Sequence, residues 1–382
     1  MKNLYQGDRG ILVSYMQLAL KRAGYPLLVD GIFGTNTCRA LADFLQTDRT
    51  PDRICVVDRS AWEKLLPYLR GYTTEEGENR ILFEDPVTSV EVPYTSLLTA
   101  AVIDGILARY PFLKSGEIGK SVMGKPISYL EIGNGEKEVF YNASFHANES
   151  ITTPVLLKFA EEYAQAYEKG TALYGVPAAE LFEEYRLFLV PLVNPDGVDL
   201  VNGLLTDGGY YRRAQQIASD YPAIPFPSGW KANIEGIDLN LQFPAGWENA
   251  KRIKYAQGYT KPAPRDYVGE APLTAPESEA VYAFTRSHDF RLITRRGRSS
   301  TGSIWTMNRR TPTRLRSILG VSAAIPWRRR PRSRDMPGIR TGLSRNTTDR
   351  ATRSRPGWEK IRFPCRISRV STGTTPEFCW AE

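Results

Sequence analysis

The sequence predicts an α/β fold in two units, a small helical unit followed by a larger α/β/α domain with a mixed sheet. The chain has 382 residues, more than one ordinary hydrophobic core accommodates. Up to about residue 72 it shows short helical periods separated by turns. Beyond residue 96, apolar strands alternate with amphipathic helices, which is typical of a sheet covered on both faces.

These patterns divide the chain into four parts. Residues 1–72 form the helical unit, and residues 73–95 are polar and acidic, as expected of a linker. Residues 96–292 form the α/β domain, which we expect to be incomplete at its C-terminal end. Residues 293–382 form a basic tail without a sustained period of 2 or 3.6, so we expect it to be poorly ordered.

Helices and strands can be placed within the first three parts. In the helical unit, apolar residues from Ile11 to Leu20 recur at helical spacing and Gly24 ends that helix. A second helix is predicted from Thr37 to Leu45, and a capping box at Ser60 opens a third. The α/β domain is predicted to contain helices over 97–110 and 151–167 and strands over 127–132, 138–143 and 186–193.

The composition excludes several classes of protein. Hydrophobic residues make up 42% of the chain and no run of eighteen apolar residues occurs, so we expect a globular protein without a membrane partner. The N-terminus lacks the apolar segment of a secretory signal, which leaves the cell wall and the cytoplasm open as compartments. Four cysteines, too scattered for a disulfide framework or a cysteine zinc site, are expected to be plain thiols: Cys38, Cys55, Cys365 and Cys379.

The charge is distributed unevenly. Residues 1–290 hold 28 Lys and Arg against 37 Asp and Glu, a net charge of −9. Residues 291–382 hold 22 against 5, a net charge of +17, and they contain none of the 20 tyrosines. A basic tail is a common feature of nucleic-acid-binding proteins, but no interleaved aromatic residues accompany this one. We therefore expect no nucleic-acid partner.

His146 and Glu149 are the candidate metal ligands. They follow a predicted strand and immediately precede a helix, and loops at the carboxyl ends of strands are where α/β proteins build their sites. Three positions apart, one imidazole nitrogen and one carboxylate oxygen can reach the same Zn²⁺ ion. A His-x-x-Glu pattern is common by itself, so the surrounding residues decide its meaning.

Residues 1–72 resemble the type 1 peptidoglycan-binding domain. The resemblance rests on Gly7 and Gly10, on Gly24-Tyr25, and on Asp30-Gly31-Ile32-Phe33-Gly34, in order and at the expected separations. It implies that the unit docks onto cell-wall glycopeptide, and it assigns peptidoglycan binding to Asp30, Gly31 and Phe33. A generic three-helix module with another ligand is the alternative.

Four ordered motifs across residues 115–290 resemble the zinc carboxypeptidase family. They are residues 119–127, the segment Phe145-His146-Ala147-Asn148-Glu149, residues 194–198 and residues 236–244. Within the family, the chain is most similar to the γ-D-glutamyl-diamino-acid endopeptidases, which cut bacterial cell-wall peptides. The resemblance implies a Zn²⁺ cofactor and peptidoglycan or muropeptides as partners.

The resemblance also assigns roles to individual residues. His146 and Glu149 match the first two zinc ligands of the family. Asn240 matches an Asn that helps to hold the substrate's terminal carboxylate, whereas Leu241 stands where the family has an Arg. Lys231 lies near the family's oxyanion-stabilising Arg, with a solvated surface lysine as the alternative. Residues 194–197 are expected to be a structural turn after a buried strand.

Two parts of the family's machinery are missing from the written sequence. The mechanism needs a third zinc ligand and a general-base Glu that takes a proton from water. The family's third ligand is a His soon after a strand such as Arg291-Leu292, but no His follows His288. His288 could substitute as a ligand, although an ordinary surface position is the favoured interpretation.

We interpret the tail as coding sequence read in the wrong frame. Codons permitted for residues 349–360, read two bases later, encode Ser-Gly-Tyr-Thr-Ile-Glu-Ala-Gly-Leu-Gly-Lys, which resembles the family's segment with the catalytic Glu. The same offset on residues 292–302 permits His-His-Thr-Gln-Gly-Gln, similar to the segment of the third ligand. The sequence thus predicts a zinc-dependent peptidase lineage that is impaired in this chain. A catalytically inactive peptidoglycan-binding protein is the alternative.

Overall fold

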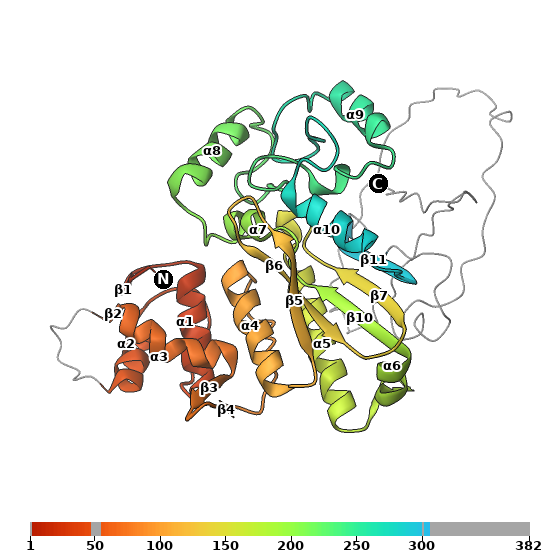
Figure 1. The fold of residues 1–382 in the computed structure, drawn as a ribbon. Helices are drawn as coiled ribbons and strands as arrows, with labels where there is room; N and C mark the ends of the chain where they lie inside the picture. Colours follow the sequence, from red (N-terminus) through yellow and green to blue (C-terminus); the bar gives the residue numbers. More distant parts are fainter. Residues whose placement is uncertain (1, 47–54, 300–301, 306–382) are drawn as a thin grey trace, which may run out of the picture.

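The computed structural model of the chain describes residues 2–46, 55–299 and 302–305 (Figure 1). Most of the expected basic tail, from residue 306 onward, lies outside the described residues. The predicted shift of reading frame over those residues is therefore not tested by the structure. Within the described ranges, none of the helices is both long enough and apolar enough to span a membrane.

The N-terminal unit contains the three helices that the sequence predicts. They are α1 (Ile11–Arg22), α2 (Thr35–Leu45) and α3 (Arg59–Arg70), and the short strands β1 (Leu4–Tyr5) and β2 (Val56–Val57) pair antiparallel beside them. The capping box expected at Ser60 is wrong. The Asp58 carboxylate caps α3 instead, because it accepts a hydrogen bond from the Ala61 amide at 2.9 Å.

Two cysteines of this unit form a disulfide bond. Cys38 in α2 and Cys55 just before β2 are bonded, with their Cα atoms 5.8 Å apart. The expectation that all four cysteines are plain thiols is therefore wrong for this pair. No local pattern indicates this bond, because its partners are 17 positions apart and come together only when α2 and β2 pack.

The segment expected to be a linker is folded. It contains the antiparallel hairpin β3 (Tyr72–Glu75) and β4 (Glu78–Ile81). Beyond the hairpin, the side chains of Val87, Val92 and Tyr94 are buried. Polar composition suggested an unpacked connection here, but these three apolar residues are enough to fix the segment against its neighbours.

The α/β domain is built on one mixed sheet, as expected. Its strands lie in the order β12-β11-β7-β10-β6-β5, in which β7 pairs parallel with β11 and β10, and the outer strands pair antiparallel. The bounds are β5 (Lys114–Lys120), β6 (Pro126–Ile132), β7 (Lys137–Asn142), β10 (Tyr185–Val190), β11 (Leu292–Ser299) and β12 (Gly302–Trp305). The sequence predicts a tail without strands from residue 293 onward. This start is too early, because β11 and β12 lie almost entirely beyond residue 292.

Helices cover both faces of the sheet. Val139 and Tyr141 of β7 face one core with α4 (Ser96–Arg109) and α5 (Thr152–Glu168), whereas Phe140 between them faces the other core with α10 (Pro276–Arg286). This two-residue alternation is the period expected of a strand that is buried on both faces. The expected α/β/α architecture is confirmed.

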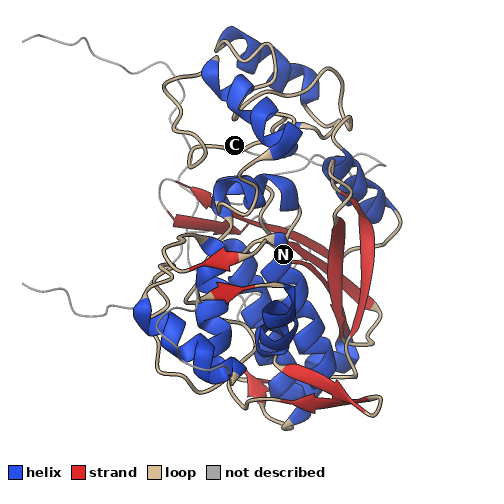
Figure 2. Cartoon of the chain, turned by 90° about the vertical axis from the view of Figure 1, so that its left-hand side faces the viewer, coloured by secondary structure: helices blue, strands red, loops and turns tan. Residues whose placement is uncertain are grey.

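The remaining elements lie around this sandwich. They are the hairpin β8 (Ala172–Leu173) and β9 (Val176–Pro177), α6 (Ala178–Glu184), α7 (Pro195–Val201), α8 (Gly208–Ser219) and α9 (Trp247–Ala256). The chain also contains two 3₁₀ turns, η1 (Ala147–Glu149) before α5 and η2 (Leu239–Leu241) before α9. Helices α8 and α9 lie at the end of the molecule away from the N-terminal helices (Figures 1 and 2).

Candidate active site

The candidate site lies at the carboxyl ends of the parallel strands. Strand β7 ends at Asn142, and four residues later His146 immediately precedes the turn η1, which ends at Glu149. Both side chains are buried, at 4% and 8% exposure. The loop that the sequence singled out is therefore where open α/β sheets place their functional groups.

The two predicted metal ligands face each other. The His146 Nδ1 atom lies 3.1 Å from the Glu149 Oε2 atom. Two donors on a tetrahedral zinc ion with bonds of about 2.0 Å are separated by about 3.3 Å. Both ring nitrogens of His146 are buried. A buried imidazole nitrogen beside a carboxylate oxygen at this spacing fits a zinc ion.

Asp238 is a further candidate residue of the site, and it has no role among the residues predicted from the sequence. Its side chain is fully buried, and its Oδ1 atom lies 3.3 Å from His146 Nε2. A carboxylate on the second nitrogen of a ligating histidine fixes the ring and leaves the first nitrogen for the metal. Asp238 belongs to the motif at residues 236–244, so this motif was the one feature of the sequence that could have indicated a role for it.

Lys231 is the second partner of Asp238. Its Nζ atom lies 3.1 Å from Asp238 Oδ2, and only 20% of its side chain is exposed. The alternative of a solvated surface lysine is therefore wrong. Burial raises the pKa of the Asp238 carboxyl, but the charge of Lys231 and the contact with His146 outweigh burial and hold that pKa well below its usual range.

Asn240 lies next to this cluster. It is the middle residue of η2, and its amide donates to Asp238 Oδ1 at 3.3 Å. Asp238 thereby connects three of the expected residues, since it contacts His146, Lys231 and Asn240. The structure brings the four expected residues of the peptidase site together around one buried carboxylate that the sequence analysis left unassigned.

Asn194 holds the site loops together, although residues 195–197 open helix α7 and do not form the expected turn. Its side-chain amide donates to the carbonyl oxygens of Phe145 at 3.2 Å and Ala232 at 2.9 Å. Phe145 directly precedes His146 in the chain, and Ala232 directly follows Lys231. Gly197 is required beside it, because a Cβ atom there would lie 2.7 Å from Asn194 Oδ1 and 2.8 Å from the Ala147 Cβ.

No third ligand completes the pair within the described ranges. No group of three or more His, Cys, Asp or Glu residues there is arranged to hold a metal ion. His288 contacts Glu138 at 3.0 Å, near the start of β7, whereas His146 follows the end of that strand. The structure therefore does not bring His288 to the site, and its ring stacks on Phe290 instead.

The expected peptidoglycan-binding residues are part of the fold of the N-terminal unit. Phe33 is 1% exposed, so its side chain packs in the core and has no surface for a ligand. Asp30 accepts a hydrogen bond from the buried Gln17 at 2.8 Å, and Gly31 adopts a positive φ of 71° in the same turn. The expectation that Phe33 contacts a ligand directly is therefore corrected. Asp30 and Gly31 are needed to build the turn of this motif.

Glu277, at the start of α10, is a buried carboxyl close to the Lys231 segment. It accepts hydrogen bonds from the Val122 amide and the Asn233 side chain, both at 3.2 Å. Burial raises the pKa of Glu277 to about 7, and the nearby Asp196 adds to the shift. The native state therefore holds this proton at pH values where the unfolded chain has released it.

This shift predicts a pH dependence of stability. Between about pH 4.5 and pH 7 the native state binds more protons than the unfolded state, so Glu277 lowers the free energy of unfolding as pH rises. The loss is at most about 3 kcal/mol and is complete above pH 7. Urea unfolding at several pH values should show a smaller decline for Glu277→Gln than for the unchanged chain. Glu279→Gln, an exposed position of the same helix, is the control and should follow the unchanged chain. Equal declines in all three proteins would contradict the assignment.

Comparison with known proteins identifies the family of the chain. The family model of the zinc carboxypeptidases matches residues 99–314, more than half of the chain. The chain belongs to the zinc carboxypeptidase family. It is thus a metallopeptidase by family, and the expected enzyme class, a hydrolase, is confirmed. The family also implies a zinc cofactor.

Two curated relatives are similar to parts of this family member. γ-D-Glutamyl-L-diamino acid endopeptidase 1 of Lysinibacillus sphaericus is 47% identical over 182 residues, 47% of this chain and 44% of the relative. The protein YqgT of Bacillus subtilis is 45% identical over 244 residues, 59% of this chain and 63% of the relative. The chain therefore spans less than two thirds of either relative.

Among solved structures, carboxypeptidase A of Helicoverpa armigera is 17% identical with a TM-score of 0.41, covering 66% of this chain and 56% of that chain.

Proposed function

We propose that this metallopeptidase belongs to a lineage that hydrolyses γ-D-glutamyl-diamino acid bonds in bacterial cell-wall peptides. The observation that carries the proposal is the buried pair His146 and Glu149, 3.1 Å apart, backed by Asp238. The 47% identity to the Lysinibacillus endopeptidase supports this bond rather than an ordinary C-terminal peptide bond. Leu241 also supports it, since an apolar side chain there cannot pair with a terminal carboxylate.

Each residue of the site has a defined part in this proposal. His146 and Glu149 would hold a zinc ion, and Asp238 keeps the imidazole oriented. Held there, the ion would supply a Lewis acid for the scissile carbonyl and a water that is nucleophilic at neutral pH. Lys231 places a positive charge where negative charge develops on the carbonyl oxygen. Asn240 orients a polar group of the substrate by hydrogen bonding.

The N-terminal unit, in this proposal, binds peptidoglycan and keeps the enzyme on its substrate polymer. Support comes from the order of the motif residues and from the turn at Asp30 and Gly31 that they build. The binding surface has to be formed by residues other than Phe33, which is buried. The full chain, rather than residues 1–72 alone, is the suitable material for sedimentation with purified peptidoglycan, because this unit shares its core with the peptidase domain.

We further propose that this chain is impaired by a shifted reading frame. The site offers two ligands within the described ranges, where a catalytic zinc ion takes three. Codons permitted for the tail can encode, in the offset frame, a His-His-Thr-Gln segment and a Thr-Ile-Glu-Ala segment, which resemble the missing ligand and base. The second candidate function, an inactive peptidoglycan-binding protein, is favoured by the same incomplete ligand set.

The bond specificity can be tested with a chain whose codons after residue 292 are read in the offset frame, here called the frame-restored chain. Two synthetic peptides that differ only in the linkage to the diamino acid, γ-D-glutamyl or α-L-glutamyl, would be compared. We expect release of the diamino acid fragment from the γ-linked peptide at a rate at least about 100-fold higher, because the catalytic groups must be aligned with the bond. Equal cleavage of both peptides, or of neither, would refute the proposed bond.

A further inference from the structure

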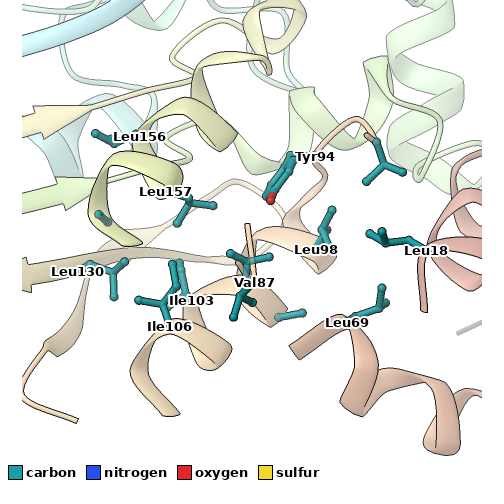
Figure 3. Packing of buried hydrophobic residues seen from close by; sticks show 14 of the residues in the cluster. Leu18, Leu69, Val87, Tyr94, Leu98, Ile103, Ile106, Leu130, Leu156 and Leu157 are labelled. Carbon is teal, nitrogen blue, oxygen red and sulfur yellow. The ribbon is translucent and has the colours of Figure 1, made fainter. Parts of the chain in front are cut away.

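The N-terminal unit and the peptidase domain share one hydrophobic core. Leu18 and Leu69 of the N-terminal unit belong to the same cluster of buried residues as Ile103, Leu130 and residues of α5. Figure 3 shows Val87 and Tyr94 lying between these two groups. A module that is only tethered to its enzyme would have a polar surface at this boundary, as interfaces between independent domains do.

The backbones of the two parts approach closely. Gly105 of α4 packs on the end of α3, where an added Cβ atom would lie 1.8 Å from the Arg70 carbonyl oxygen and 2.7 Å from a Val87 methyl group. Only glycine permits this contact without moving one helix. The two parts are therefore fitted to each other at the level of the main chain.

Residues 86–96, which we call the clasp, bind the N-terminal unit with polar contacts. The Tyr15 hydroxyl donates to the Pro93 carbonyl oxygen at 2.8 Å and lies 2.9 Å from the Thr95 hydroxyl. The Arg22 guanidinium donates to the Val87 carbonyl oxygen and also to the Leu69 carbonyl oxygen at 3.2 Å. One arginine thus links α3 to the clasp.

The same clasp binds the peptidase domain. The buried Glu161 carboxylate of α5 accepts hydrogen bonds from the amides of Val87 at 2.7 Å and Thr88 at 2.9 Å. At the other end, the Ser96 amide donates to Asp199 at 2.7 Å. Asp199 in turn lies 2.7 Å from the Lys125 Nζ atom. Both ends of the clasp are therefore fixed to buried charged groups.

The contacts continue to the metal-ligand loop. The Asn202 side-chain amide donates to the Tyr94 carbonyl oxygen at 2.6 Å and to the Ser150 hydroxyl at 3.1 Å. Ser150 directly follows Glu149 in the chain. A single side chain thus joins the clasp, which Tyr15 holds, to the turn that carries a proposed zinc ligand.

From these contacts we infer that the N-terminal unit is a structural part of the peptidase, and that Tyr15 and Asn202 are positioning residues for the His146–Glu149 loop. Docking of the unit holds the clasp, the clasp orients Asn202, and Asn202 restrains the end of η1. Detachment of the unit therefore loosens the loop. The inference depends on the position of this loop and not on the identity of the substrate.

Hydrogen exchange measured by mass spectrometry on the full chain tests the inference. Tyr15→Phe removes the clasp contact, and we expect peptides over residues 143–152 to exchange about five- to tenfold faster, as loss of one buried hydrogen bond allows. Asn202→Ala should give the same change in that segment and in residues 86–96. Tyr25→Phe is the matched control, because Tyr25 packs on Phe44 inside the N-terminal unit, and it should leave residues 143–152 unchanged.

The unchanged chain provides a second measurement that does not depend on a variant folding. With increasing urea, the exchange of residues 11–22, 86–96 and 143–152 should converge on one opening step. If residues 11–22 open at lower urea while residues 143–152 keep full protection, the N-terminal unit is only tethered and the inference is overturned. Acceleration in Tyr15→Phe that stays within residues 11–46 would overturn it as well. Neither readout involves substrate, so failure here is distinct from failure of the proposed function.

Discussion

The frame-restored chain is expected to turn over a γ-D-glutamyl-diamino acid peptide at least about 100-fold faster than the chain as written. A positioned general base contributes a factor of about 10² to 10⁴. A third protein ligand also raises zinc affinity by orders of magnitude, because structural and catalytic zinc sites draw their affinity from a complete ligand set. We expect the frame-restored chain to hold about one zinc ion per molecule, measured by elemental analysis, and the written chain to hold much less.

The matched control for this experiment is the frame-restored chain with His146→Ala. It keeps the restored segment but loses the imidazole that lies 3.1 Å from Glu149, so its zinc content and turnover should fall to the level of the written chain. Equal zinc content and equal turnover in the written and frame-restored chains would show that the third ligand and the base lie elsewhere in the sequence.

The largest effect on stability is expected from Asp238→Ala. The Asp238 side chain is fully buried and lies between Lys231 and His146, at 3.1 Å and 3.3 Å. Its removal leaves the mostly buried Lys231 ammonium without its partner, and breaking a buried ion pair in this way costs about 3–5 kcal/mol. It also removes the acceptor for the Asp266 amide. Urea unfolding should show this loss in the free energy of unfolding.

Asp220→Ala is the control for this substitution. Asp220 pairs with Lys261 at 2.8 Å, but 47% and 60% of the two side chains are exposed. Water screens such a pair, so its loss should leave the free energy of unfolding nearly unchanged. In the frame-restored chain, Asp238→Ala should also weaken zinc binding about 10- to 100-fold, because it frees the ring of His146. Equal stability of the two variants would show that the buried contacts of Asp238 with Lys231 and His146 do not stabilise the fold.

The position of the site could be predicted from sequence because it depends on local order. His146 and Glu149 follow a strand and precede a helix, and that order alone places them at the carboxyl edge of the sheet. Helix positions followed from apolar periodicity in the same way. Asp238 was not assigned, since its role depends on a contact with His146, 92 positions away, that no local pattern encodes.

The errors have the same cause. The polar composition of residues 73–95 predicts a linker that includes all of the clasp except Ser96, yet Val87 and Tyr94 are buried by helices from both parts of the chain. The disulfide partner of Cys38 and the environment of Phe33 also depend on packing between elements. The helix cap at Ser60 was misplaced by two residues, which is within the usual uncertainty of helix ends.

The bond between Cys38 and Cys55 has a consequence for how a proteolytic cut in the N-terminal unit would be detected. A protease that cleaves the chain once between these two residues opens a covalent loop but releases no fragment, because the disulfide still joins the two pieces. Gel electrophoresis without a reducing agent would then show a single band of full mass. Two bands would separate only after a thiol is added. Without a reducing agent, the gel would therefore not distinguish a cleaved preparation from an intact one.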